Sequence, residues 1–256
     1  MCRLTAYIGP KIALERIVTK PAHSLLDQSQ DATEAKLSVN GDGFGIAWYG
    51  DEAEPGLYRD VLPAWSDGNL TSLCRVVKSH LFLAHVRAST VGEVSRTNCH
   101  PFTYGRWSFA HNGQIGGFTQ IRRALESQLP DTLYNHRRGT TDSELFFLLC
   151  LSNGLDENPQ KAIQTTLRSI EALQSETTEP NRLACILSNG ASVFGFRMSS
   201  DNTCPTLYRS KSLCAGGVAL ASEPLDGDHQ NWTALKRGTL VQLNLDLPKA
   251  ETIGLA

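Results

Sequence analysis

Residues 1–8 read MCRLTAYI. Apolar residues alternate from Cys2 to Ile8, which predicts a first strand that ends at Gly9-Pro10. Removal of the initiator methionine ahead of the small Cys2 would leave a thiol and a free α-amine on one residue. The thiol has an ordinary pKa of about 8.5 and the amine one of about 7.7 to 8.0, so the amine can accept the thiol proton near neutral pH. Cys2 is therefore a candidate nucleophile, and the alternative is a small buried residue in an edge strand.

The composition is that of an ordinary globular protein, with 41% hydrophobic and 20% charged residues. The formal net charge of −2 provides no positive field to attract nucleic acid or a membrane surface. The first twenty residues lack the apolar core of a secretory signal, and no apolar run is long enough to span a membrane. The seven cysteines lack CxxC spacing, which predicts reduced thiols in a cytoplasmic protein. We expect one domain over residues 1–256.

Two segments in the first half of the chain carry residues suited to a site. Asn40-Gly41-Asp42-Gly43-Phe44-Gly45 precedes a strand at 46–49, and its glycines indicate either a tight turn or a wall of an active-site cleft. The apolar strand 80–86 leads directly into Arg87. A guanidinium at that point can bind a carboxylate through two hydrogen bonds, although for a lone arginine a structural ion pair is the simpler explanation.

Two further segments have both a structural and a functional interpretation. A strand at 107–110 is expected to stop at His111-Asn112-Gly113, where Asn-Gly indicates a hairpin or, alternatively, two donors of an oxyanion hole. Thr141 and Glu144 have the spacing of a capping box for the helix that contains residues 145–151. Asp142, at the same cap, can also bind an ammonium group.

Metal binding is not expected. The three histidines near these segments, His85, His100 and His111, have neither HxH nor HxxxH spacing, and no carboxylates cluster with them. We expect supporting roles for all three and no cofactor.

The order of elements predicts an α+β layered fold. A short helix capped by Ser24 and another at 70–77 come early, two helices at 118–129 and 159–175 follow, and strands are expected at 183–188 and 191–196 around Asn189-Gly190. Strands at 218–222 and 239–245 complete the chain without regular βαβ alternation.

Taken together, the segments resemble a known family. The order is Cys2, GDGFG at 41–45, HVRAST at 85–90, NCHPF at 98–102, HNG at 111–113 and TTDSE at 140–144. This order and spacing resemble the class II glutamine amidotransferases of the N-terminal-nucleophile hydrolase superfamily. The motifs cover residues 2–144, and the remainder, including LASEPL at 220–225, is similar to the stand-alone branch of that family.

The resemblance implies a four-layer αββα sandwich and a set of residue roles. Cys2 would attack the γ-carbonyl of a glutamine-like group, with its own amine as base, and a thioester would follow. Arg87, helped by groups around Thr90, would bind the substrate α-carboxylate, and Asp142 would bind the α-ammonium. Asn112 and Gly113 would form the oxyanion hole. The resemblance also implies supporting roles for the site residues Asp42, Gly43, His100 and His111.

The resemblance leaves three functions open. In the first, a stand-alone hydrolase cleaves a small-molecule γ-glutamyl conjugate, and is similar to the ergothioneine-pathway γ-glutamyl hydrolase or to the amidotransferase subunit of glutathione degradation. Ala88 favours it, because amidotransferases with a synthase domain commonly carry tryptophan in this loop and a small residue leaves a wider entrance. In the second, the chain is a glutaminase subunit that supplies ammonia to a separate synthase or other protein partner. The third is a non-catalytic binding or regulatory protein, against which the intact set of site residues argues.

Overall fold

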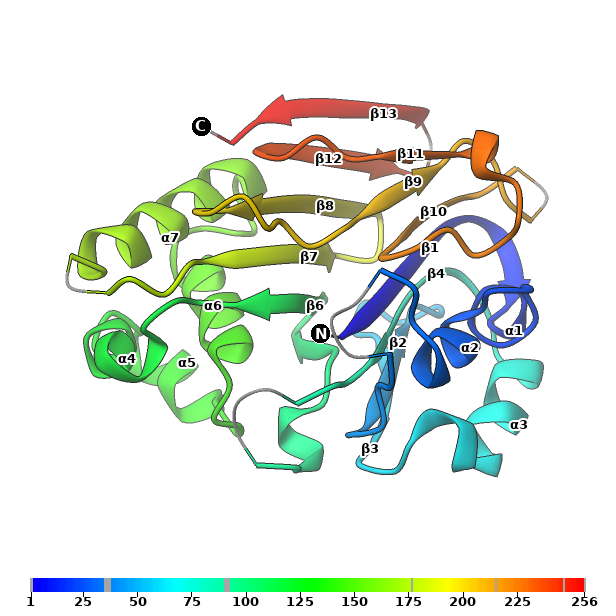
Figure 1. Ribbon diagram of the computed structural model, residues 1–256, viewed down its shortest axis with the longest axis horizontal. Helices are drawn as coiled ribbons and strands as arrows, with labels where there is room; N and C mark the ends of the chain where they lie inside the picture. The colour runs from blue at the N-terminus through cyan, green and yellow to red at the C-terminus, as the bar shows by residue number, and fades with distance from the viewer. Residues whose placement is uncertain are drawn as a thin grey trace.

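Two antiparallel sheets form the centre of the molecule, and helices cover both outer faces (Figure 1). The computed structural model describes residues 2–34, 38–89, 93–175, 177–214, 216–245 and 247–255, without the side chains of 247–253. None of the helices in these ranges is both long and apolar enough to cross a membrane.

The first sheet has the strand order β11-β9-β10-β1-β4-β2-β3, which places the first strand of the chain in its interior. Its strands are β1 (Arg3–Ala13), β2 (Phe44–Trp48), β3 (Gly56–Asp60), β4 (Lys78–Val86), β9 (Tyr208–Ser210), β10 (Val218–Ala221) and β11 (Trp232–Ala234). The second sheet has the order β13-β12-β8-β7-β6-β5. Its strands are β5 (Phe102–Tyr104), β6 (Trp107–Gln114), β7 (Arg182–Ser188), β8 (Ser192–Ser199), β12 (Thr239–Asn244) and β13 (Leu247–Gly254).

Two groups of helices form the outer layers. The first group packs on the first sheet and comprises α1 (Glu15–Val18), α2 (Leu25–Gln30) and α3 (Gly68–Val76). The second group packs on the second sheet and comprises α4 (Phe118–Glu126), α5 (Asp131–His136), α6 (Asp142–Ser152) and α7 (Pro159–Leu173). Short 3₁₀ turns lie at Ala64–Ser66, Arg96–Asn98 and His229–Asn231.

The period of two along each strand separates three hydrophobic cores. Leu4, Ala6 and Ile8 of β1 lie in the core between the two sheets, together with Ala110 of β6. Tyr7 of β1 lies in the core beneath α1–α3. A third core joins the outer face of the second sheet to α4–α7. Three cores between four layers give the αββα sandwich that was predicted.

Two predicted strand ends are wrong. β1 does not end at Gly9-Pro10 but continues to Ala13, with a register shift between Ile8 and Ile12. Gly9, at φ 154°, takes up the irregularity, and proline is tolerated at such a bulge because no ladder hydrogen bond is required there. β6 also continues past Ala110 through Gln114, so the HNG segment lies within a strand instead of forming a hairpin.

Several local predictions are confirmed. The hairpin at Asn189-Gly190 joins β7 to β8. Ser24 caps α2, where its hydroxyl accepts the Asp27 N–H at 3.2 Å and the Asp27 carboxylate accepts the Ser24 N–H at 3.1 Å. Thr141 caps α6 by accepting the Glu144 N–H at 3.2 Å.

Candidate functional site

Cys2 lies at the head of the central strand of the first sheet. Arg3 pairs with Val86 across β1 and β4, so the same register, continued by one residue, places Cys2 opposite Arg87. The alternation of β1, continued in the same way, directs Cys2 to the inner face with Leu4 and Ala6. The half-buried Cys2 Sγ lies 3.5 Å from the Ala88 carbonyl oxygen. The candidate nucleophile and the candidate carboxylate-binding cation therefore lie at one end of neighbouring strands.

The environment of Cys2 favours the protonated thiol. Burial raises the pKa of the Cys2 thiol, while the hydrogen bond to the Ala88 carbonyl and the positive charge of Arg87 partly oppose that rise. A thiol that is protonated at neutral pH is a weak nucleophile until a neighbouring base takes its proton. Any attack by Cys2 consequently requires a base.

Arg87 is buried, with 3% of its surface exposed. Its guanidinium donates to Ser89 Oγ at 3.1 Å and to the Glu93 carbonyl at 3.4 Å. Within the described ranges, no carboxylate forms a salt bridge with Arg87, so the structural ion pair considered above is absent there. Thr90, the other predicted carboxylate-binding residue, lies outside the described residues.

The glycine-rich segment holds the end of β4 in place. The Asp42 N–H donates to the Arg87 carbonyl at 2.9 Å, and the Arg87 N–H donates to the Gly43 carbonyl at 2.8 Å. The Asp42 carboxylate accepts the Ser89 N–H at 2.7 Å. Gly43 has φ 116°, and a Cβ there would lie 2.6 Å from Cys99 Sγ. Asp42 and Gly43 thus support the residues around Arg87 from the neighbouring strand.

Asn112 lies on the second sheet, in the strand that contacts the strands carrying Cys2 and Arg87. It lies on β6, two residues after Ala110 of the inter-sheet core, and β6 contacts both β1 and β4. Its side chain is fully buried, yet neither Oδ1 nor Nδ2 has a hydrogen-bond partner among the described residues. Because buried amides are normally paired, this one is suited to a partner that arrives with the substrate.

Gly113 adopts a backbone conformation that other residues rarely reach. Its φ is 144°, and a Cβ there would overlap the Arg182 carbonyl on β7. Glycine is required at this position on both grounds.

Asp142 joins the end of β6 to the start of α6. Its Oδ2 accepts the Ile115 N–H at 2.8 Å, and its Oδ1 accepts the Ser143 N–H at 2.8 Å. Glu144 does not complete the capping box predicted for this cap, because its carboxylate accepts the N–H groups of Arg138 and Gly139 instead. Asp142 is half-buried, and its carboxylate lies beside the segment that follows Gly113.

All three histidines are buried, and His111 lies on the helix-covered face of the second sheet, where it stacks on Phe109. The His85 and His100 ring centroids are 4.2 Å apart, and His111 Nδ1 is hydrogen-bonded to Ser143 Oγ at 2.8 Å. Burial lowers the pKa of all three, to about 3 for His85. No group of three or more potential metal ligands occurs among the residues that the structure describes.

Asn98 connects the two halves of the candidate site and was not predicted as a site residue. Its Nδ2 donates to the Glu93 carbonyl at 3.0 Å and to Thr140 Oγ1 at 3.2 Å, and its Oδ1 accepts the Thr140 N–H at 2.8 Å. It therefore links the segment that holds Arg87 to the segment that carries Asp142. Its position in the NCHPF motif was the available signal.

One cavity beside β1 is not the candidate site. A cavity of about 310 Å³ is lined by Ile8, Gly9, Pro10 and Val218, at the opposite end of β1 from Cys2. Its lining includes none of the predicted site residues. The residue chemistry, and not the size of a hollow, therefore locates the site.

Comparison with known proteins identifies the family. A family model described as glutamine amidotransferases class-II matches residues 28–211. The probable glutamine amidotransferase DUG3 of Saccharomyces cerevisiae is 33% identical over 291 residues, which cover 95% of this chain and 82% of that protein. The gamma-glutamyl-hercynylcysteine sulfoxide hydrolase of Mycolicibacterium smegmatis is 30% identical over 247 residues, which cover 95% of this chain and 96% of that protein.

Solved structures give the same result. A glutamine aminotransferase class-II domain protein from Silicibacter pomeroyi has a TM-score of 0.79 at 36% identity, and the match covers 100% of both chains. The glutamine phosphoribosylpyrophosphate amidotransferase of B. subtilis has a TM-score of 0.68 at 16% identity, over 100% of this chain and 49% of that one, a likeness that concerns the fold. The chain belongs to the class II glutamine amidotransferases and is an amidotransferase-type enzyme that acts on a C–N amide bond.

Proposed function

We propose that this enzyme hydrolyses the γ-glutamyl amide bond of a small γ-glutamyl conjugate, with Cys2 as the nucleophile, and releases glutamate. The proposal is supported by the placement of Cys2 and Asn112 on strands of the two sheets that contact each other. One provides a thiol beside the Ala88 carbonyl, and the other provides a buried amide without a partner in the described chain. Acyl transfer requires a nucleophile together with a donor that is free to bind the developing oxyanion, and these two residues supply both.

The chemical steps follow from these groups. Removal of Met1 frees the α-amine of Cys2, which takes the thiol proton as Sγ attacks the γ-carbonyl carbon. Asn112 Nδ2 and the Gly113 N–H donate to the oxygen that becomes negative. The amine then returns the proton to the departing nitrogen, and the C–N bond breaks to leave a γ-glutamyl thioester on Cys2. Water attacks the thioester, and glutamate leaves with the thiol restored.

Two opposite charges hold the glutamyl head group. The guanidinium of Arg87 would exchange its hydrogen bonds to Ser89 and the Glu93 carbonyl for the substrate α-carboxylate. The Asp142 carboxylate would accept the substrate α-ammonium, and groups around Thr90 would assist at the carboxylate. A cation and an anion at fixed positions orient the γ-carbonyl towards Cys2.

Two observations support a leaving group larger than ammonia. The M. smegmatis relative that matches 95% of this chain is named as a hydrolase of a γ-glutamyl-hercynylcysteine sulfoxide. In addition, the residue after Arg87 is the small Ala88, whose carbonyl lies 3.5 Å from Cys2 Sγ. Glutamine hydrolysis on behalf of a separate synthase is the second candidate, and it is favoured by the name of the S. cerevisiae relative.

A substrate panel tests the proposal. Glutamate release is measured for Met-processed protein with glutamine, glutathione, a γ-glutamyl amide and a γ-glutamyl sulfoxide conjugate, and the Cys2→Ala variant serves as control. We expect the highest kcat/KM for a bulky conjugate and no release by the variant. Efficient turnover of glutamine alone would support the glutaminase subunit instead. The absence of glutamate release from every substrate, or glutamate release by the Cys2→Ala variant, would contradict the proposal.

A further inference from the structure

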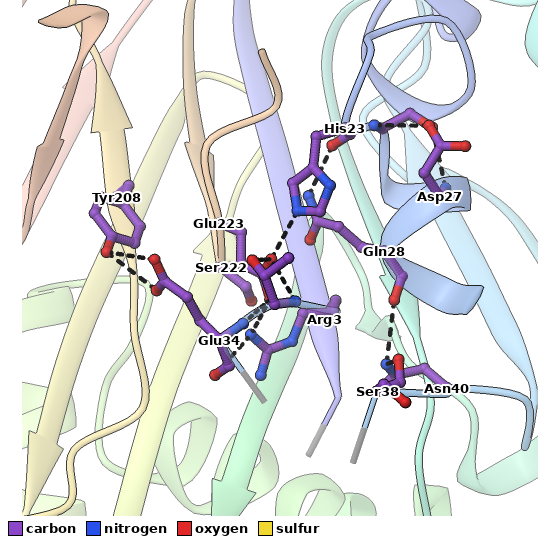
Figure 2. Close-up of polar contacts among 12 residues, drawn as sticks. Arg3, His23, Asp27, Gln28, Glu34, Ser38, Asn40, Tyr208, Ser222 and Glu223 are labelled. Carbon is purple, nitrogen blue, oxygen red and sulfur yellow. Dashed lines mark hydrogen bonds and ion pairs between the residues drawn. The ribbon is translucent and has the colours of Figure 1, made fainter. Parts of the chain in front are cut away.

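A buried ion pair lies on the opposite face of the sheet from the Cys2 thiol. Thr5 pairs with Ala221 across β1 and β10, and the same register, continued by two residues, places Arg3 opposite Glu223. Arg3 Nη1 lies 2.9 Å from Glu223 Oε1, with 0% and 1% of the two side chains exposed (Figure 2). The ion pair therefore adjoins the nucleophile without facing the substrate.

The Glu223 carboxylate accepts hydrogen bonds from three segments of the chain. Its Oε2 accepts His23 Nε2 at 2.7 Å and the Thr33 hydroxyl at 2.7 Å, and both Thr33 and Glu34 donate their backbone N–H groups to the carboxylate. Burial alone would raise the pKa of Glu223, but the hydrogen bonds from Thr33, His23 and Glu34 together lower it to about 2. Glu223 is therefore charged at neutral pH, and it holds segment 33–34 against the head of β1.

Arg3 transmits this anchoring to Cys2. Its Nε donates to the Cys2 carbonyl at 2.7 Å, while Glu223 fixes the other end of the guanidinium. Ser222 adds two bonds on the same side, because its N–H donates to the Leu4 carbonyl at 2.9 Å and its hydroxyl accepts the Leu4 N–H at 3.0 Å. A fixed Cys2 carbonyl restricts rotation about the Cα–C bond of Cys2, and this rotation sets where the amine and the thiol point.

Stability alone does not account for this pair. A buried ion pair carries a large desolvation cost, and well-packed apolar residues in its place are often neutral or stabilising. If the ion pair orients a neighbouring group, that role explains why both positions carry charged residues. We propose that Glu223 is a positioning residue for Cys2, acting through Arg3 to hold the amine and the thiol in their reactive orientation. This inference rests on the proposed role of Cys2 as nucleophile.

Two variants test the inference. Glu223→Gln keeps the size of the side chain but removes its charge, and the double variant Arg3→Met with Glu223→Leu removes both charges together. Asp156→Asn is the matched control, because Asp156 also pairs with an arginine, Arg106, but on an exposed part of the surface. Each protein is compared by kcat, KM, melting temperature and the rate at which iodoacetamide alkylates Cys2, followed on the Cys2 peptide by mass spectrometry. The half-buried Cys204 and Cys214 provide internal reference rates.

Positioning predicts a specific combination of results. In Glu223→Gln, kcat and the relative alkylation rate of Cys2 should fall by about 10- to 100-fold while KM changes by less than about threefold. The double variant should melt close to the wild-type temperature and still show both losses, which keeps the test valid if the single variant does not fold. Wild-type kcat and alkylation in Glu223→Gln, or full recovery of both in the double variant, would overturn the inference. Alkylation needs no substrate, so failure of the proposed hydrolysis would be seen separately, as a wild-type enzyme without turnover.

Discussion

Asn112 combines features that rarely occur together in one residue. Its side chain is fully buried on β6, and its amide has no hydrogen-bond partner among the described residues. A buried polar group without a partner costs about 1–3 kcal/mol, so a purely structural role would favour an apolar residue. In the proposed reaction the amide gains its partner only when the γ-carbonyl oxygen becomes negative.

Replacement of Asn112 should therefore separate activity from stability. We expect Asn112→Leu to lower kcat by about 10²–10³-fold, because one oxyanion donor is lost. The melting temperature should not fall, because no hydrogen bond within the described chain is removed. Steady-state kinetics and thermal unfolding of the same preparation provide the measurement. A large drop in melting temperature with unchanged kcat would show that Asn112 is structural.

The negative charge of Asp142 should contribute to substrate binding through the α-ammonium. Asp142→Asn keeps an oxygen that can accept the Ile115 N–H but loses the negative charge. We expect KM to rise by about tenfold or more for γ-glutamyl substrates, since a charge-assisted hydrogen bond is lost. A substrate analogue without the α-amino group provides the control and should have the same KM with both proteins. Equal increases for the substrate and the analogue would contradict this role.

At the scale of elements, β6 has an unusual backbone conformation where it carries the candidate oxyanion donors. The strand continues through His111 and Asn112, which pair with Cys185 and Ala184 of β7, and it reaches Gly113 at φ 144°. A strand interior places Asn112 more firmly than a hairpin tip would. The position of the candidate oxyanion donors thus depends on how β7 supports β6.

Gly113→Ala should damage both the fold and the site. The substitution forces an alanine into a conformation that costs about 1–3 kcal/mol, and its Cβ would overlap the Arg182 carbonyl. We expect a lower free energy of unfolding in urea and a loss of kcat. Gly227→Ala is the matched control, because Gly227 has no positive φ and a Cβ there would meet no described atom within 4 Å. Identical urea midpoints for the two variants would show that the β6 conformation is not required.

The sequence predicted elements better where local chemistry determines them. Ser24, Thr141 and Asn189-Gly190 act through neighbours a few residues away, and their caps and hairpin are confirmed. Gly9-Pro10 and the HNG segment have the composition of turns, but pairing with distant strands keeps both within β1 and β6. Long-range pairing in these cases overrides the local preference.

At the scale of the whole molecule, two sheets bring distant segments to one place. The order of the motifs predicted the site residues Cys2, Arg87, Asn112 and Asp142. Their arrangement in space depends on the two sheets and on α6, the helix that begins at Asp142. The Arg3–Glu223 pair could not be predicted, because its partners are separated by 220 positions and only the β1–β10 register aligns them.

The buried histidines make the stability of the whole molecule depend on pH. His85 and His100 are neutral in the fold because burial lowers the pKa of each, whereas an unfolded histidine has a pKa of about 6.5. Below that value the unfolded chain binds protons that the native state does not, so stability falls as pH decreases. His100→Leu should reduce the loss between about pH 7.5 and about pH 5.5 by about 1.4 kcal/mol.

Urea unfolding at the two pH values measures this effect. His229→Gln is the control, because His229 is exposed, and its loss of stability should match that of the wild type. Parallel pH dependences for His100→Leu and the wild type would show that His100 is not a neutral buried group.

Rapid quenching of the enzyme during turnover tests the role of Cys2 most directly. The protein is mixed with its best γ-glutamyl substrate, stopped in acid and digested, and the N-terminal peptide is analysed by mass spectrometry. The account predicts a peptide that begins at Cys2, without Met1, and carries a γ-glutamyl group on the thiol during the steady state. An active enzyme that retains Met1, or one that carries the γ-glutamyl group on another residue, would contradict it.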